Sequence, residues 1–328
     1  MNNRLRAAAP CLRWGVAVAL VMAAVSVAAD GDCDAVLAVE RQGTIWLWHA
    51  RDGERELVQG GCAALERGAR RLAYCTPADA MGQPGRELHV RRLDGTHPEW
   101  VHRAGEGAFI SEAAWSPEGG RLAFIETDRD YRSHLMLWSP GGPARRVASA
   151  PGSMSHLWWS LGWIADGSAL TVHDMTVLQR IALDGRAPDS IPLPELIGAG
   201  LETVTSTDRV LPAPHDPTVF AYTRLVPGSA LFSRVMHEPN SALFVHDRFL
   251  GRGKNLRLTA EAVTVLDVAW TPDGRSLHFA GYLDIHAADE DPFRIYRIDR
   301  NGRGLRALLR GERVSVACRE PASREAIK

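Results

Sequence analysis

The feature that most constrains the fold is a repeated segment. "EAAWSPEGGRLAFIE" at Glu112–Glu126 returns as "DVAWTPDGRSLHFAG" at Asp267–Gly281, and both read as a Trp, a turn and an apolar strand. A third copy contains Trp163 in "GWIADGSALTVHD", and weaker copies surround Leu65 and span Leu211–Arg224. A repeat of this kind, spaced at about 50 residues, is typical of repeat architectures and decides the fold before individual strands are assigned.

A second motif follows each copy of the first. It is an alternating apolar and polar stretch that ends in a turn such as Asp-Gly or Asn-Gly, and its six copies end at Gly53, Gly95, Gly142, Gly185, Gly253 and Gly302. Alternation with a period of two indicates a strand, and these dipeptides supply the positive backbone angles of a tight hairpin. Each unit therefore predicts four antiparallel strands, which we letter a to d, and no stretch has the amphipathic pattern of a long helix.

Six such units predict an all-β six-bladed β-propeller of four-stranded antiparallel blades, in preference to two sandwich domains or a stack of sheets. The first unit lacks strand a, whereas the C-terminus has a surplus strand, "RVSVAC". We predict that this strand completes the first blade, so that N- and C-terminal strands close the ring.

Once the N-terminal Cys11 is set aside with an export signal, four cysteines remain and allow three pairings. The predicted strand pattern selects one of these three, which contains two disulfides. Cys33 and Cys318 lie at neighbouring strand ends of the closing blade, and Cys62 and Cys75 lie on either side of the a–b hairpin of the second blade. We therefore expect Cys33–Cys318 and Cys62–Cys75 disulfides.

The motifs "WSPEGGRLAFIE", "WIADGSALTV" and "WTPDGRSLHF" resemble the WD40-like repeat of TolB-type six-bladed propellers over residues 33–318. This resemblance implies the propeller fold but is poorly specific for function. The chain departs from TolB itself by lacking the extra N-terminal domain before the propeller. Similar blades occur in prolyl oligopeptidase-like peptidases and in oligogalacturonate lyases, so the fold alone does not define an activity.

The N-terminus predicts export. Arg4, Arg6 and Arg13 precede an apolar run from Trp14 to Val25, which small residues follow up to Ala29. We interpret residues 1–29 as a signal peptide cleaved near Ala29 and residues 30–328 as one domain, periplasmic or secreted. We expect contact with a membrane only through the signal segment, and the net charge of −1 argues against a nucleic-acid partner.

The sequence contains no Gly-x-Ser-x-Gly nucleophile motif and no dinucleotide-binding glycine motif. The chain ends about ten residues after the predicted ring closure, which leaves no room for a further catalytic domain. A lyase or hydrolase working inside the channel on a carbohydrate or another small molecule remains the alternative, since it requires only side chains converging from several blades.

Long b–c connections place most loop length on one face, where propellers usually bind. From them we select Tyr131, Arg132, His134, His237 and His286 as candidate binding residues, because Tyr and Arg are enriched at interfaces. Asp284, His286 and Asp289 are the residues that could hold a divalent metal. We expect no cofactor, with this metal as the alternative.

We therefore predict an exported, non-catalytic propeller that binds an envelope or extracellular protein or peptide and is a monomer. The alternatives are the channel-sited enzyme with a metal and a propeller that binds a small ligand without turning it over.

Overall fold

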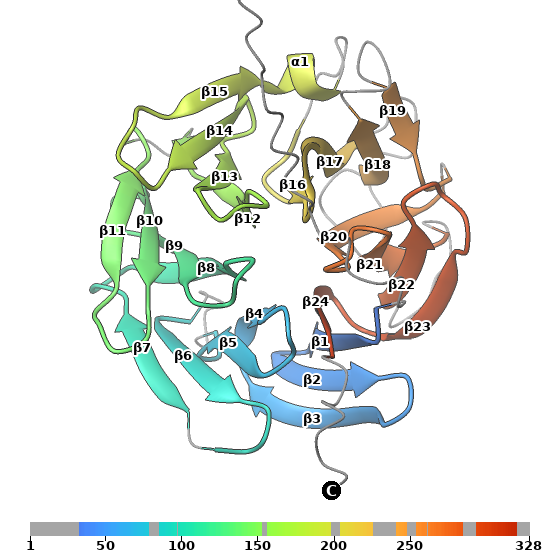
Figure 1. Cartoon of the computed structure of the whole chain (residues 1–328), viewed down its shortest axis with the longest axis horizontal. Helices are drawn as coiled ribbons and strands as arrows, with labels where there is room; N and C mark the ends of the chain where they lie inside the picture. Colours follow the sequence, from blue (N-terminus) through green and yellow to red (C-terminus); the bar gives the residue numbers. More distant parts are fainter. Residues whose placement is uncertain are drawn as a thin grey trace, which may run out of the picture. The chain divides into compact units, whose positions relative to one another are not determined.

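The computed structural model divides the chain into two units, Met1–Asp32 and Cys33–Lys328. It describes, all within the second unit, residues 33–78, 85–96, 98–152, 156–197, 204–225, 241–247, 254–260, 262–284 and 293–319. These residues form six antiparallel four-stranded sheets that succeed one another around a ring (Figure 1). The prediction of an all-β six-bladed propeller is confirmed.

In each blade the strands run in the order a, b, c, d from the centre of the ring outward. Strand a is, from blade one to blade six, β24 (Arg313–Cys318), β4 (Gly61–Leu65), β8 (Phe109–Trp115), β12 (Trp159–Trp163), β16 (Val210–Ala213) and β20 (Thr264–Trp270). Strand b is β1 (Ala35–Arg41), β5 (Arg71–Cys75), β9 (Leu122–Thr127), β13 (Ala169–His173), β17 (Asp216–Leu225) and β21 (Ser276–Tyr282).

The two outer strands follow the predicted hairpin motif in every blade. Strand c is β2 (Thr44–His49), β6 (Glu87–Arg92), β10 (Ser133–Trp138), β14 (Val177–Ala182), β18 (Ser241–Asp247) and β22 (Arg294–Asp299). Strand d is β3 (Gly53–Gln59), β7 (Glu99–Arg103), β11 (Arg145–Ser149), β15 (Asp189–Pro192), β19 (Lys254–Arg257) and β23 (Arg306–Arg310). In two of the c–d turns Gly95 and Gly302 have φ of 93° and 85°, which side chains disfavour.

The first blade closes the ring as expected. β24 pairs antiparallel with β1, with Cys318 opposite Ala35 and Val314 opposite Val39. A disulfide joins Cys33 to Cys318, and the sequence separation of 285 residues means that it links the two ends of the described chain. Non-covalent strand pairing and one covalent bond therefore hold the same closure.

The second disulfide, Cys62–Cys75, is also confirmed, but its register is not that of a regular hairpin. Gly61, not Cys62, lies opposite Cys75, because a bulge interrupts β4 between Gly61 and Ala64. Cys62 has a positive φ of 47° inside this bulge. A β-bulge re-aims the inserted side chain, and here it turns the Cys62 thiol toward strand b.

The repeated Trp joins neighbouring blades. The indole nitrogens of Trp115, Trp163 and Trp270 each donate a hydrogen bond to a carbonyl on strand a of the preceding blade, over 3.1, 2.9 and 3.2 Å. The acceptors are the carbonyl oxygens of Ala64, Ala114 and Leu211. The repeated Trp therefore joins three pairs of neighbouring blades through the same kind of bond.

Arginine side chains reinforce two of these junctions. Arg71 of blade two lies 4.4 Å from the ring centre of Trp115, and Arg121 of blade three lies 4.9 Å from that of Trp163. Each guanidinium group also pairs with an acid of its own a–b turn, Arg71 with Glu66 and Arg121 with Glu118. An arginine over an indole face adds a cation–π attraction to the apolar contact.

The described part of the chain contains one short helix, α1 (Leu193–Ile197), in the connection from blade four to blade five. Leu193, Leu196 and Ile197 pack with Phe220 and Phe244 of blade five. Among the residues described, no helix has the length and the apolar character needed to cross a membrane.

Candidate functional site: the propeller channel

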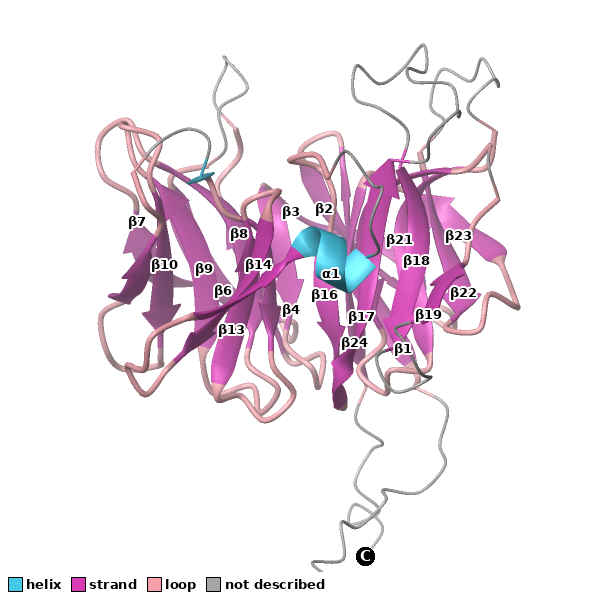
Figure 2. Ribbon diagram, turned by 90° about the horizontal axis from the view of Figure 1, so that it is seen from above, coloured by secondary structure: helices cyan, strands magenta, loops and turns pink. Residues whose placement is uncertain are grey.

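Strand a of every blade borders a central channel, and the strands run between two faces of the ring (Figure 2). We call the face with the a–b and c–d turns the turn face and the face with the b–c and d–a connections the loop face. A cavity of about 450 Å³ lies on the loop-face side of the channel, and one of about 260 Å³ on the turn-face side. Five residues line both cavities: Glu40, Cys62, Glu112, Arg209 and Arg313.

Charged side chains from four blades meet between the two cavities. Nη1 of Arg209 lies 2.6 Å from Oε1 of Glu112, and its Nε lies 3.0 Å from Oδ1 of Asp267. Arg313 reaches the same Glu112 oxygen over 3.0 Å. With Glu40 these residues form what we call the channel cluster, in which two guanidinium groups pair with two carboxylates inside the channel.

The carboxylates of the cluster also bind backbone groups of strand a. Oε1 of Glu40 accepts a hydrogen bond from the amide of Ala63 over 2.7 Å, and Oδ2 of Asp267 accepts one from the amide of Val314 over 2.9 Å. Strand a is the inner edge of each sheet, so its backbone amides on the channel side have no strand partner. Each carboxylate therefore satisfies a backbone donor of the next blade and joins two blades.

The environment drives the pKa values of the two glutamates apart. Burial raises the pKa of Glu40, against the opposing charge of Arg313. Burial also disfavours ionisation of Glu112, but the charges of Arg209 and Arg313 and their hydrogen bonds outweigh it and lower the Glu112 pKa. The channel thus holds one firmly ionised carboxylate and one that protonates more easily.

A recurring position in strand a directs side chains into the channel. Glu112 and Asp267 each stand three residues before the repeated Trp, and in both strands a bulge lies just before them. The same position holds Cys62 in blade two and Ser160 in blade four, and all four residues line the turn-face cavity. A bulge lies at or just before this position in all four strands, and it re-aims the strand so that these residues reach the cavity wall.

The loop-face cavity combines an indole ring with hydroxyl groups. Trp159, half-buried at the start of β12, lines it with Thr76, Ser111 and Thr207. The indole nitrogen of Trp159 is buried and has no hydrogen-bond partner among the described residues. Trp158, the residue before it, is 3% exposed and lies in the core.

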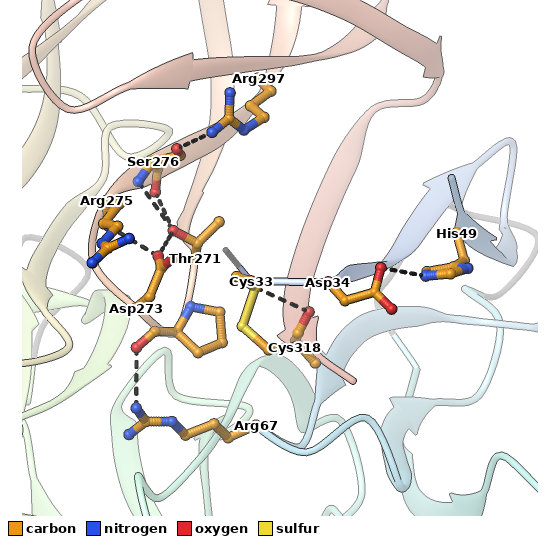
Figure 3. Close-up of a disulfide and its surroundings, with 12 residues drawn as sticks. Cys33, Asp34, His49, Arg67, Thr271, Asp273, Arg275, Ser276, Arg297 and Cys318 are labelled. Atoms are coloured by element: carbon orange, nitrogen blue, oxygen red, sulfur yellow. Dashed lines mark hydrogen bonds and ion pairs between the residues drawn. A yellow bond between two sulfur atoms is a disulfide. The ribbon is translucent and has the colours of Figure 1, made fainter. Parts of the chain in front are cut away.

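One side chain spans blades at the turn face. Arg67, from the a–b turn of blade two, donates through Nη2 to the carbonyl of Pro272 in blade six over 3.2 Å, and the same nitrogen lies 3.0 Å from Nε2 of His215 in blade five. Figure 3 shows Arg67 close to the Cys33–Cys318 disulfide and to the turn that contains Thr271 and Asp273. This contact narrows the channel on the turn-face side.

The predicted loop residues are not gathered in one described site. Tyr131 is 48% exposed and Arg132 is exposed, both in the b–c connection of blade three. Asp284 is exposed after β21, whereas His237, His286 and Asp289 lie outside the described residues.

The placement of His134 in this loop is wrong. It belongs to β10 and is 4% exposed, because Nδ1 lies 2.8 Å from Oγ of Ser149 and Nε2 lies 3.0 Å from Oδ2 of Asp128. Its side chain ties the loop to the sheet. The strand pairing already begins at Ser133, which lies opposite Thr127.

Other described histidines make local structural contacts. Nε2 of His173 donates to the carbonyl of Asp208 over 3.0 Å, so its Nδ1 accepts from the amide of Met175. Burial lowers the pKa of His173 to about 4. His102 pairs with Glu126 over 2.6 Å. In the described part of the chain no three or more His, Cys, Asp or Glu side chains are grouped so that they could hold a metal ion.

Sequence reasoning missed the channel cluster. Its signal was present as a polar residue three positions before the repeated Trp, in "ISEAAW" and "VLDVAW", where an inward-facing strand position would ordinarily be apolar. Arg209 and Glu40 carry no such signal, because Arg209 lies just outside β16 and Glu40 reaches the channel from strand b.

The fold is a six-bladed β-propeller, and solved structures of TolB proteins share it. It is similar to a TolB-type protein from Agrobacterium tumefaciens, with 15% identity and a TM-score of 0.56 over 89% of this chain and 100% of the other. It is also similar to TolB from Acinetobacter baumannii, with 14% identity and a TM-score of 0.54 over 84% of this chain and 69% of that one.

An oligogalacturonate lyase in complex with manganese has 13% identity and a TM-score of 0.50 over 81% of this chain and 70% of its own. Among curated sequences, the Tol-Pal system protein TolB of Escherichia fergusonii is 39% identical over 82 residues. That match spans 25% of this chain and 18% of the relative's length. No protein-family model matches the chain. At these identities the structural likenesses establish the fold.

Proposed function

We propose that this protein is an exported, non-catalytic propeller that binds a protein or peptide at the loop-face end of its channel. One observation carries the proposal, the cavity of about 450 Å³ on that face, which Trp159 lines together with hydroxyl groups. An aromatic ring provides apolar contact area and the neighbouring hydroxyl groups can hydrogen-bond, and aromatic residues of this kind are enriched at binding hot spots.

The channel cluster supports a binding role for the cavity floor. Arg209, Arg313 and Glu112 are held by mutual ion pairs, so the floor is rigid and its charges are in place before a ligand arrives. Preorganised polar groups reduce the entropic cost of binding. The exposed Tyr131, Arg132 and Asp284 are the proposed outer contacts on the same face, and His237 and His286, which lie outside the described residues, are proposed as binding residues from the sequence alone.

Export to the periplasm or to the outside of the cell is part of this proposal. Two disulfides connect cysteines of the described chain, and disulfides persist in oxidising compartments. Similarity to TolB, whose name places it in the Tol-Pal system, supports an envelope protein as the partner.

The test is affinity capture from envelope extract with residues 30–328 as bait. A Trp159→Ala bait removes the indole from the loop-face cavity, and a Trp100→Ala bait is the matched control, because Trp100 is 57% exposed on the outer strand β7. We expect a partner that the wild-type and Trp100→Ala baits retain and that Trp159→Ala loses by at least about tenfold. Equal retention by all three baits would refute the loop-face cavity as the site.

The channel-sited enzyme is a second candidate because the pKa values of Glu40 and Glu112 are pushed in opposite directions. Two carboxyl groups with separated pKa values are the arrangement that general acid–base catalysis uses. Metal analysis of the purified protein and a screen of acidic polysaccharides, with Glu40→Gln as the comparison, test it. Turnover that Glu40→Gln abolishes would establish the enzyme.

A further inference from the structure

Two arginines for which the described residues provide no counter-ion meet on one face of blade five. Arg224 stands near the end of β17, and Arg257 ends β19, both at the loop face. The strand register places Tyr222 opposite Phe244 and Phe244 opposite Arg257, so the side chains share a face of the sheet. The Cζ atom of Arg224 lies 4.5 Å from the Phe244 ring centre, and that of Arg257 lies 6.0 Å from it.

Several donors of this group are buried and unpaired. Among the residues that the structure describes, Nε and Nη1 of Arg224, Nη2 of Arg257 and the hydroxyl of Tyr222 have no hydrogen-bond partner. Arg257 is anchored through Nε, which donates to the carbonyl of Thr259 over 2.7 Å. Tyr222 stacks on Phe244 with ring centres 5.2 Å apart, so the aromatic base beneath both guanidinium groups is fixed.

Two other arginines that stack on aromatic rings in this propeller do have a carboxylate partner. Arg71 and Arg121 also lie over indole rings, yet each pairs with a glutamate, over 2.8 and 2.7 Å. Among the ion pairs of the described residues none involves Arg224 or Arg257. Burial and the positive charge of Arg257 both lower the pKa of Arg224.

Two unpaired arginines over one ring destabilise the folded protein when no anion is bound. Buried donors are almost always paired, and two like charges above one ring repel each other. Water can satisfy the donors but cannot neutralise the charge, whereas an oxyanion does both. The planar guanidinium fork matches the oxygen atoms of a carboxylate or phosphate group in a bidentate geometry.

We propose that Arg224, Arg257 and the hydroxyl of Tyr222 form an oxyanion-binding site at the loop face of blade five, which takes a carboxylate or phosphate group. The site lies beside α1, whose Leu196 and Ile197 pack in the same cluster as Tyr222 and Phe244. It involves none of the channel residues, so it stands independently of the proposed channel function.

The test is a titration of residues 30–328 with inorganic phosphate and, separately, with malonate, at constant ionic strength maintained with sodium chloride. Calorimetry gives the dissociation constant, and the melting temperature gives an independent readout. We expect at least one of the two anions to bind and to raise the melting temperature of the wild-type protein. Binding of phosphate alone identifies a phosphate site, and binding of malonate identifies a carboxylate site.

Arg224→Gln and Arg257→Gln should each raise the dissociation constant of the anion by at least about tenfold, since each removes a charge-assisted hydrogen bond. Arg121→Gln is the matched control, because it removes an arginine that stacks on a ring and is already paired, and it should leave the dissociation constant unchanged. In anion-free buffer, Arg224→Met should melt no lower than the wild type, because an unpaired buried charge is lost. Failure of both anions to bind, or binding by both Gln variants as tight as that of the wild type, would overturn the proposal.

Discussion

The two disulfides allow the contribution of ring closure to be measured within one protein. Cys33–Cys318 spans 285 residues of sequence and Cys62–Cys75 spans 13. A cross-link stabilises chiefly by removing loop-closure entropy from the unfolded chain, and this model gives about 5.6 kcal/mol for the long loop and about 3 kcal/mol for the short one. With an unfolding entropy of roughly 2.1 cal/mol/K per residue, these values correspond to melting shifts of roughly 9 °C and roughly 5 °C.

The assay uses two double variants, each of which retains a single disulfide. Cys62→Ala with Cys75→Ala leaves the closing disulfide, and Cys33→Ala with Cys318→Ala leaves the hairpin disulfide. Each variant is melted with and without a reductant, so the shift reports the remaining cross-link and not the lost side chains. The first variant should lose about twice as much stability on reduction as the second. A larger loss from the hairpin disulfide would refute the loop-closure reasoning.

Three further predictions concern the channel, the blade junctions and the buried histidine. Glu112→Gln should destabilise by about 3 kcal/mol in chemical denaturation, because Arg313 loses the carboxylate with which it pairs and Arg209 keeps only Asp267; a cost below about 1 kcal/mol would mean that the channel cluster is solvated. Trp163→Phe should cost about 1–3 kcal/mol, since the carbonyl of Ala114 loses its donor, whereas the exposed Trp100 changed to Phe should stay within about 0.5 kcal/mol. The pKa of His173 in the folded protein is about 4, below the ordinary 6.5, so the unfolded state binds the proton first. The free energy of unfolding should therefore fall by up to about 3 kcal/mol as the pH drops from 6.5 to 4. In His173→Gln this dependence on pH should be weaker, and parallel plots of unfolding free energy against pH for the two proteins would contradict the assignment.

The fold could be predicted from the sequence because the same hairpin motif recurs in every blade. The Trp before a turn returns at Trp115, Trp163 and Trp270, and its indole makes the same bond to the preceding blade each time. The surplus strand at Arg313–Cys318 could be assigned to the first blade by counting strands, since a ring of sheets has no free place for it. The Cys33–Cys318 disulfide followed from that assignment, and Cys62–Cys75 followed from the a–b hairpin of the second blade.

The site was recovered only in part. Tyr131 is exposed and His134 is buried although they are only three positions apart. The reason is that Ser133 already pairs with Thr127, and the register of the partner strand sets where a strand begins. The polar position before the repeated Trp was visible in Glu112 and Asp267 but was not interpreted.

The sequence by itself determined the strand order, the turns, the number of blades and the covalent closure, since these depend on patterns within about 50 residues and on the chain ends. Only the tertiary structure decided which charges meet. Arg209 pairs with Glu112 across 97 positions of sequence and Arg313 pairs with it across 201, and Arg224 and Arg257 share one phenyl ring. The closed ring brings these groups together because each blade turns its inner strand toward the same axis, and no local pattern encodes that convergence.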